Sequence, residues 1–326
     1  MIALDAVGGD RAPGEAVAGA IEAARRFRMH IALVGPRKII ENELARHTDV
    51  PRFELVEASQ VIAMDELPTQ AVRKKRDASI NIAMRMLRDG EAEAVVSAGN
   101  TGALVASALL NLGRLPGIHR PAIGALLPSS EHGVLLLDAG ANAESKPPYL
   151  VQFAHMGSAY MERMFGIGRP RVGLLNIGEE ENKGNDLAQD VYPKLKRSNL
   201  NFVGNIEGKD IARGMVDVVV TDGFTGNVAV KMSEASVEFV LSQVKRVLMT
   251  GFRNRLAALA LRDALRGVVR RLDYSEYGGV PLLGVNGIVI AAHGRSDANA
   301  FKNALRIARE AVSTGILEAL STTPRR

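Results

Sequence analysis

Residues 95–107, VVSAGNTGALVAS, join a hydrophobic strand-like run to a segment of helical composition through a cluster of small polar residues. Gly99 permits a close backbone approach, and Ser97, Asn100 and Thr101 add hydrogen-bond donors. The first amide groups of a helix, together with the positive end of its dipole, favour an anion. Two interpretations are therefore open: a cradle for phosphate, or a tight turn in which Asn100 or Thr101 caps the helix.

The known nucleotide-binding loops narrow the choice of anion. No lysine follows the glycines of this stretch, so it is not a Walker loop, and the chain contains no G-x-G-x-x-G fingerprint of a dinucleotide site. We therefore expect a small anion at this turn.

The same alternation of strand and helix extends along the whole chain. Strands are predicted at 1–6, 30–35, 53–59, 93–98, 133–138, 171–176, 201–205, 216–221 and 287–292. Helices are predicted at 13–28, 66–89, 101–112, 147–165, 183–197, 225–249, 254–272 and 296–320. Continuous apolar strands flanked by helices indicate an α/β fold with a mostly parallel sheet covered on both faces. We expect one domain over residues 1–326, with a helical hairpin excursion at about 235–273.

Polar and small residues recur where the predicted strands end. They are Asp5, Gly8, Gly9 and Asp10; Ser97, Gly99 and Asn100; Asp138, Gly140 and Asn142; Asn176, Gly178 and Glu179; Gly204, Asn205 and Gly208; Asp222, Gly223 and Asn227; and His293 and Gly294. Any one of these groups fits an ordinary turn or helix cap. Their recurrence favours a ligand-lined edge, because open α/β sheets bind ligands at the carboxyl ends of their strands.

Composition limits the classes of function. The 326 residues include no cysteine, which excludes disulfides, thiolate metal sites and a cysteine nucleophile. No apolar run approaches the roughly 18 residues of a membrane span, and the first ten residues are not a signal peptide, so a cytoplasmic protein is expected. The net charge of +5 favours acidic partners. An aromatic content of 4% without tryptophan gives little for stacking on bases, which argues against a nucleic-acid partner.

Three further loops carry candidate chemistry. In 176–190, NIGEEENKGNDLAQD, Lys183 could pair with phosphate or an oxyanion. The neighbouring acids Glu179, Glu180 and Glu181 could form a metal site or a solvated acidic patch, and a run of charges is usually a solvated face. Asn227 opens a helix after the strand 216–221. His293 is the one histidine at a predicted strand–helix junction, a place where histidine is more often structural than catalytic. No Ser-His-Asp order with a nucleophile elbow is visible.

The segment 241–272 is strongly basic. It carries Lys245, Arg246, Arg253, Arg255, Arg262, Arg266, Arg270 and Arg271 against the single acid Asp263. On a helix, Leu261, Leu265, Val268 and Leu272 share one stripe, while Arg262, Arg266 and Arg270 lie on another flank. Such an element suits an anionic membrane surface or an acidic protein, and it equally suits a surface helix packed on the domain or on a dimer partner.

Several long blocks of the sequence resemble one family. LDAVGGDRAP, VVSAGNTGAL, LLDAGAN, LLNIGEEENKGN, NFVGNIEGKDI, DVVVTDGFTGNVAVK and YGGVPLLGVNGIVIAAHGRSD occur in this order between residue 4 and residue 297. They resemble the bacterial acyl-acyl-carrier-protein:phosphate acyltransferases (the PlsX family), and the resemblance extends from residue 1 to about 305.

The resemblance implies transfer of a long-chain fatty acyl group from acyl carrier protein to inorganic phosphate. The acyl phosphate product is consumed by a membrane glycerol-3-phosphate acyltransferase in phospholipid synthesis. The family fold is a three-layer α/β/α sandwich of the isocitrate dehydrogenase and phosphotransacetylase type, usually a homodimer, with no metal or redox cofactor. Family members associate peripherally with the inner face of the membrane through a helical hairpin. Its counterpart here is the basic segment, with Leu261, Leu265, Arg262 and Arg266 as membrane or partner contacts.

The resemblance also suggests roles for the strand-end residues. We expect Ser97, Gly99, Asn100 and Thr101 to hold phosphate, and Lys183 with Asn227 to contact phosphate or the oxyanion. His293 is the candidate proton donor to the leaving thiolate, and Asp5, Asp10 and Asp138 orient donors. Further residues expected at the substrate site are Gly8, Gly9, Asn142, Asn176 and Asp222. Replacing Lys183 with alanine is expected to abolish acyl phosphate formation without unfolding the protein.

Overall fold

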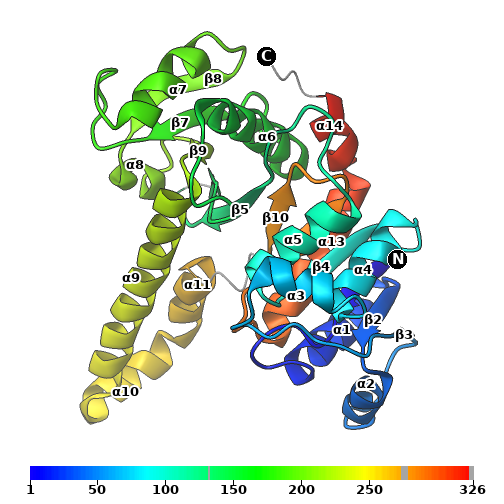
Figure 1. Ribbon diagram of the computed structural model, residues 1–326. Coiled ribbons are helices and arrows are strands. Elements are labelled where there is room, and N and C mark those ends of the chain that lie inside the picture. Colours follow the sequence, from blue (N-terminus) through cyan, green and yellow to red (C-terminus); the bar gives the residue numbers. More distant parts are fainter. Residues whose placement is uncertain (131–132, 273–277, 323–326) are drawn as a thin grey trace.

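Figure 1 shows the computed structural model of the protein, which describes residues 1–130, 133–272 and 278–322. The strands are β1 (Ile2–Asp5), β2 (Ile31–Gly35), β3 (Glu54–Glu57), β4 (Ala94–Ser97), β5 (Ala122–Leu127), β6 (Val134–Leu137), β7 (Arg171–Leu175), β8 (Asn201–Ile206), β9 (Val218–Val220), β10 (Val280–Leu283) and β11 (Ile288–Ala291). They form one sheet in the order β3-β2-β1-β4-β11-β10-β5-β6-β9-β7-β8.

The sheet consists of two parallel sets joined by antiparallel strands. From β3 to β11 all neighbours are parallel, and so are all neighbours from β6 to β8. Between the two sets, β10 pairs antiparallel with both β11 and β5, and β5 pairs antiparallel with β6. The two parallel sets therefore run in opposite directions, with β10 and β5 at the centre of the sheet.

Helices cover both faces of the sheet. They are α1 (Gly14–Phe27), α2 (Arg37–Leu44), α3 (Pro68–Lys74), α4 (Ser79–Arg88), α5 (Thr101–Asn111), α6 (Pro147–Phe165), α7 (Asp186–Lys196), α8 (Gly208–Ala212), α9 (Gly223–Met249), α10 (Gly251–Ala260), α11 (Arg262–Leu272), α13 (Ala298–Ser313) and α14 (Ile316–Thr322). Side chains alternate along each strand, so Val95 of β4 packs with α4 and α5 on one face, whereas Val96 packs with α1 and α13 on the other.

The side chains of the central strand β5 show that α5 and α9, from the two halves of the sheet, cover the same face. Ile123 belongs to the apolar cluster under α5, and Leu127, four residues later on the same face of the strand, belongs to the cluster that includes residues of α9. Because side chains two and four residues apart on a strand point the same way, α5 and α9 lie on the same side of the sheet. Helix α5 contacts β11 on one side of the central strands, and α9 contacts β5 and β6 on the other.

Helix α9 leaves the body of the protein and begins the hairpin, residues 223–272. Its first turns contact β5 and β6, and its later turns extend away from the sheet (Figure 1). Helix α10 packs against α9, and α11 leads back toward the sheet. The predicted start of the excursion near 235 falls inside α9, because one continuous helix of 27 residues serves both the body and the hairpin.

The predicted α/β fold with a mostly parallel sheet is confirmed, and each of the nine predicted strands overlaps a strand of the structure. The strands β5 and β10 were not predicted. Three predicted helices are each two: 66–89 forms α3 and α4, 254–272 falls on α10 and α11, and 296–320 forms α13 and α14.

Candidate functional site

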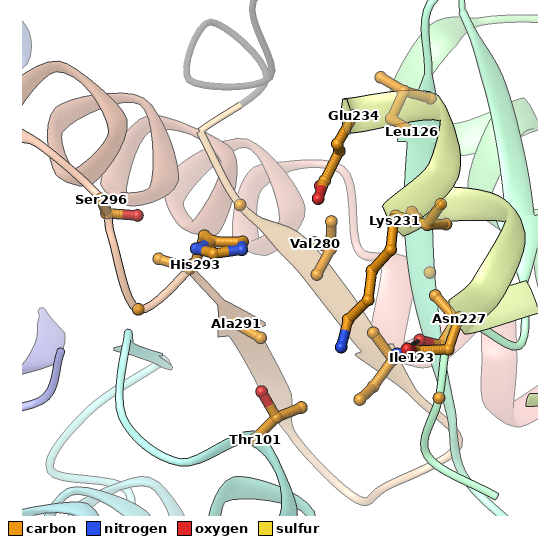
Figure 2. A pocket seen from close by; sticks show the side chains of 18 of the residues that line it. Thr101, Ile123, Leu126, Asn227, Lys231, Glu234, Val280, Ala291, His293 and Ser296 are labelled. Atoms are coloured by element: carbon orange, nitrogen blue, oxygen red, sulfur yellow. Dashed lines mark hydrogen bonds between the residues drawn. The ribbon is translucent and has the colours of Figure 1, made fainter. Parts of the chain in front are cut away.

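A cavity of about 970 Å³ lies between α5 and α9, over the central strands β5 and β10. Its polar lining residues include Asp10, Thr101, Asn227, Lys231, Glu234 and His293. Figure 2 shows the ring of His293 and the amine of Lys231 pointing into the cavity from opposite sides, with Thr101 and Ile123 nearby. The cavity thus joins the strand ends of the first half of the sheet to the start of the hairpin.

At the turn between β4 and α5, Ser97 is turned inward. The Ser97 hydroxyl donates to Oδ2 of Asp5 at 2.7 Å and accepts from the backbone N–H of Gly99 at 3.1 Å. Both Ser97 and Asp5 are buried. Burial raises the pKa of Asp5, and the hydrogen bond from Ser97 acts in the opposite direction. A β-carbon at Gly8 would clash with the Asp5 carboxylate and with the Gly99 amide, so these residues form a tightly packed support for the turn.

The side chain of Asn100 also stabilises the turn through hydrogen bonds within the protein. Its side-chain oxygen accepts from the N–H of Ala103 at 3.0 Å, which makes it the N-cap of α5. Its amide group donates to the carbonyl oxygens of Met64 at 2.9 Å and Glu66 at 3.3 Å. Thr101, by contrast, is exposed and lines the cavity. Of the three donors in this turn, Thr101 is therefore the one placed to meet a ligand.

Asp138 organises the loop after β6. Its buried carboxylate accepts hydrogen bonds from the N–H groups of Ile123, Gly140, Ala141 and Asn142 and from the Asn142 side chain, at 2.8–3.2 Å. Burial raises the pKa of Asp138, and these hydrogen bonds oppose the shift. The side-chain amide of Asn142 also donates to the carbonyl oxygen of Pro121 at 2.8 Å. Asp138 and Asn142 therefore shape the cavity wall at 139–141 rather than face the cavity themselves.

The start of α9 packs directly on this loop. Asp222 caps the helix by accepting from the N–H of Thr225 at 2.9 Å. A β-carbon at Gly226 would overlap the carbonyl oxygen of Asp138. One residue later, the Asn227 side chain donates to the carbonyl oxygen of Ala139 at 2.9 Å, and it lines the cavity.

Lys231 is a cavity residue that sequence reasoning missed. It lies one helical turn after Asn227, and its amine points into the cavity (Figure 2). The signal was present in the block TGNVAVK, since residues four apart on a helix share a face. Lys231 supplies a positive charge beside Thr101 and Asn227.

His293 and Asp10 close the opposite side. The N–H of Asp10 donates to the carbonyl oxygen of Gly294 at 2.7 Å, which ties the loop after β1 to the loop after β11. The Nδ1 atom of His293 accepts from the N–H of Arg295 at 3.1 Å, so a neutral His293 ring carries its proton on Nε2. Gly9, with a φ of 108°, adopts the left-handed conformation that favours glycine in the same loop.

Lys183 lies on the loop between β7 and α7 and is exposed. The Asn176 side chain holds this loop by donating to the Lys183 carbonyl oxygen at 3.0 Å. Among the described residues that line the cavity, neither Lys183 nor Asn176 occurs. Lys183 thus belongs to the same set of strand-end loops as Asp138 and Asp222, but not to the cavity wall.

Two of the three acids beside Lys183 form ion pairs with lysines. Glu181 lies 2.5 Å from the Lys196 amine, which lowers the pKa of Glu181, and Glu179 lies 3.5 Å from the amine of Lys209. Within the described ranges, no group of three or more His, Cys, Asp or Glu side chains is arranged to hold a metal ion. The ion pairs of Glu179 and Glu181 fit the solvated acidic patch.

The hairpin exposes both charge and apolar surface. Leu261, Arg262 and Arg266 are exposed, and Leu265 is half-buried. Other exposed apolar side chains of the hairpin include Phe239, Val240, Val247, Phe252, Leu256 and Leu259. The side chains of Arg270, Arg271 and Leu272 lie outside the described part of the structure. None of the described helices is long and apolar enough to cross a membrane.

Comparison with known proteins gives consistent matches over nearly the whole chain. A model of the family described as "Fatty acid synthesis protein" matches residues 1–319. The phosphate acyltransferase of Heliobacterium modesticaldum is 54% identical, in a match that covers 98% of this chain and 96% of that protein. The phosphate acyltransferase of Desulfitobacterium hafniense strain DCB-2 is 48% identical, with the same two coverages.

Solved structures show the same fold at low sequence identity. A phosphotransacetylase from Streptococcus pyogenes superposes with a TM-score of 0.60 at 17% identity, covering 96% of this chain and 94% of that one. A 4-hydroxythreonine-4-phosphate dehydrogenase from Klebsiella pneumoniae superposes with a TM-score of 0.56 at 12% identity, covering 96% and 99%. The fold is thus of the phosphotransacetylase type, as expected from the sequence.

Proposed function

This chain belongs to the phosphate acyltransferase family, and we propose that it transfers a long-chain fatty acyl group from acyl carrier protein to inorganic phosphate. The acyl phosphate product would then serve a membrane glycerol-3-phosphate acyltransferase in phospholipid synthesis. The observation that carries the proposal is the convergence of Thr101, Asn227, Lys231 and His293 on one cavity whose remaining wall is largely apolar. Such a site can hold a small anion beside a hydrocarbon chain.

In the proposed reaction a phosphate oxygen attacks the thioester carbonyl carbon. A C–O bond forms, the carbonyl oxygen becomes an oxyanion, and collapse of this intermediate breaks the C–S bond and releases a thiolate. No covalent enzyme intermediate and no metal or redox cofactor is needed. Positioning of the two reactants and preorganised donors supply the acceleration.

The cavity residues suit distinct parts of this reaction. Thr101 and the first amide groups of α5 bind phosphate, and Lys231 neutralises its charge. The amide group of Asn227 keeps a second hydrogen beyond the one given to Ala139, and it contacts phosphate or the oxyanion. His293 presents its Nε2–H as a hydrogen-bond donor to the leaving thiolate, and the proton that the thiolate takes up is the one that the attacking hydrogen phosphate gives up. Asp5, Asp10 and Asp138 hold the loops that carry these donors.

The direct test of this function is product trapping. The protein is incubated with palmitoyl-acyl carrier protein and phosphate, and hydroxylamine converts any acyl phosphate to a hydroxamate. We expect phosphate-dependent hydroxamate and release of the free carrier thiol in equal amounts. An absence of product across a range of salt concentrations would contradict the proposal.

We also propose that the protein works in the cytoplasm as a homodimer that associates peripherally with an anionic membrane. The support is the hairpin, which presents Arg262 and Arg266 beside exposed apolar side chains such as Leu261, at 53% exposure. A basic element with exposed apolar side chains binds anionic lipid through both charge and apolar burial. The net charge of +5 favours the encounter with an acidic carrier protein in the same way.

Replacing Leu261 with glutamate is expected to weaken vesicle binding by about tenfold or more, since burial of a leucine side chain is worth about 1.5–3 kcal/mol. The measurement is sedimentation with vesicles of phosphatidylglycerol and phosphatidylcholine. Leu110→Glu is the matched control, because Leu110 is an equally exposed leucine, at 59%, on α5. Equal binding by the parent and Leu261→Glu would assign the exposed face of the hairpin to packing between protein subunits.

A further inference from the structure

The cavity has one wall that is apolar and only partly covered. Beyond Thr101 and Gly102, the residues of α5 that line it are Val105, Ala106 and Leu109. Val105 and Leu109 lie on the same helix face as Thr101, because they follow it by four and eight residues. Ala106 lies next to Val105 on the edge of this face. Ile123 of β5 and Ala141 of the loop after β6 line the same cavity. We refer to Val105, Ala106, Leu109, Ile123 and Ala141 as the α5 wall.

The residues of the α5 wall are placed to contact an apolar ligand. Ile123 is buried in the apolar cluster under α5, while Val105, Ala106 and Ala141 pack against that cluster and remain half-buried. The part of their surface that the protein leaves uncovered faces the cavity. An apolar surface of this kind gains free energy when a hydrocarbon replaces the water on it.

The opposite side of the cavity mixes charged and apolar side chains. There α9 contributes Lys231, Glu234 and Glu238 together with the half-buried Val230, Val237 and Leu241. Glu238 lies 3.6 Å from the guanidinium of Arg295. Val269 of α11 is 41% exposed. A surface that carries charged side chains among its apolar ones is less favourable to hydrocarbon than the α5 wall, whose five residues are all apolar.

We propose that the α5 wall binds the fatty acyl chain and that Ala106 and Leu109 determine how chain length affects turnover. The inference rests on the proposed function, since it places the chain of the acyl thioester whose carbonyl lies near Thr101 and Lys231. The helical rise of about 1.5 Å per residue puts Ala106 about 7.5 Å and Leu109 about 12 Å beyond Thr101. An extended chain advances about 1.2 Å per main-chain atom, so these positions correspond to roughly the sixth and the tenth carbon.

The test is a pair of enlarging substitutions, Ala106→Leu and Leu109→Phe, assayed with acyl carrier protein that carries chains from 4 to 18 carbons. Ala106→Leu is expected to lower kcat/KM by at least tenfold for chains longer than about six carbons, and Leu109→Phe only for those longer than about ten. Shorter chains should react as with the parent. Thermal unfolding of each variant checks that the fold is kept, and because the two positions differ in depth, either variant alone still tests the proposal.

Two matched controls add the same bulk elsewhere. Leu110→Phe changes the exposed neighbour of Leu109 and is expected to leave the chain-length profile unchanged. Leu241→Phe fills the cavity from α9 instead. A profile altered by Leu241→Phe and untouched by the α5 variants would place the chain along the hairpin and overturn the proposal. An equal loss at all chain lengths would overturn it too, by assigning the α5 wall to the carrier's thiol arm.

A binding measurement separates this inference from the proposed function. The fluorescence of bound parinaric acid, an 18-carbon chain, reports occupancy of the wall without any reaction. Weaker binding by Ala106→Leu but not by Leu110→Phe would uphold the α5 wall even if the parent formed no acyl phosphate. Unchanged binding and an unchanged profile in an active enzyme would refute the α5 wall while leaving the function in place.

Discussion

Replacing Lys231 with methionine should lower kcat/KM for acyl phosphate formation by about 100- to 1000-fold, because the phosphate would lose its positive partner and the usual loss on removing one preorganised donor is of this size. Lys231 lies in the cavity beside Asn227, one turn away on the same helix face. Methionine keeps most of the length and apolar contact of the lysine stem, so the substitution removes the charge and little packing. Hydroxamate trapping at varied phosphate concentration measures both kcat and KM, and circular dichroism checks the fold.

Lys183→Ala is the informative comparison. Because Lys183 is exposed on a neighbouring loop and does not line the cavity, we now expect a smaller loss, about tenfold, from a charge that acts through solvent. If Lys183→Ala abolished the reaction while Lys231→Met left it near normal, the cation of the site would be Lys183. That result would overturn the assignment of Lys231.

Replacing Gly226 with alanine should destabilise the protein by about 3 kcal/mol, at the upper end of the usual cost of overpacking. For a chain of this size that corresponds to a fall of roughly 4 °C in Tm. The new methyl group would overlap the carbonyl oxygen of Asp138, so α9 must move away from β6. Asn227 and Lys231 move with it, and we expect kcat/KM to fall by about 100-fold even in the folded protein.

Gly267→Ala provides the control for the change in helix propensity. Gly267 lies inside α11, where a β-carbon would have no neighbour within 4 Å. Alanine there should leave Tm unchanged or slightly raised, because alanine is favoured over glycine by about 0.5–1 kcal/mol in a helix. Differential scanning fluorimetry on both variants compares them. A Gly226→Ala protein as stable and active as Gly267→Ala would show that α9 does not need this close contact.

The sequence predicted the parallel strands because each has a continuous apolar run and a polar turn at its end. It did not predict β5 and β10, two of the strands that line the cavity. Pro281 lies in the middle of β10, where proline normally argues against a central strand, and β5 contains Ala122, Gly124 and Ala125 in place of β-branched residues. Their pairing depends on contacts with distant segments, which local patterns do not reveal.

The sequence indicated which turns form the candidate site. It gave the same role to donors that have different roles in the structure. Ser97, Asn100 and Thr101 are equivalent in a list of donors, but hydrogen bonds to Asp5 and to the Met64 carbonyl already occupy the first two. Only the folded arrangement shows which donor faces the cavity. Lys231 was not predicted because it lies two helical turns after the polar turn at Asp222, and the prediction considered only residues close to the strand ends.

The position of β11 has a consequence for how the protein is made. This strand lies between β4 and β10, yet it is the last strand along the described chain, and His293 follows it directly. On the ribosome, where amino-terminal segments fold first, β1 to β4 can pair early but their inner edge stays open until β11 emerges. The cavity is therefore complete only after β11 has emerged, and a nascent chain that has exposed its hairpin still lacks part of the cavity wall.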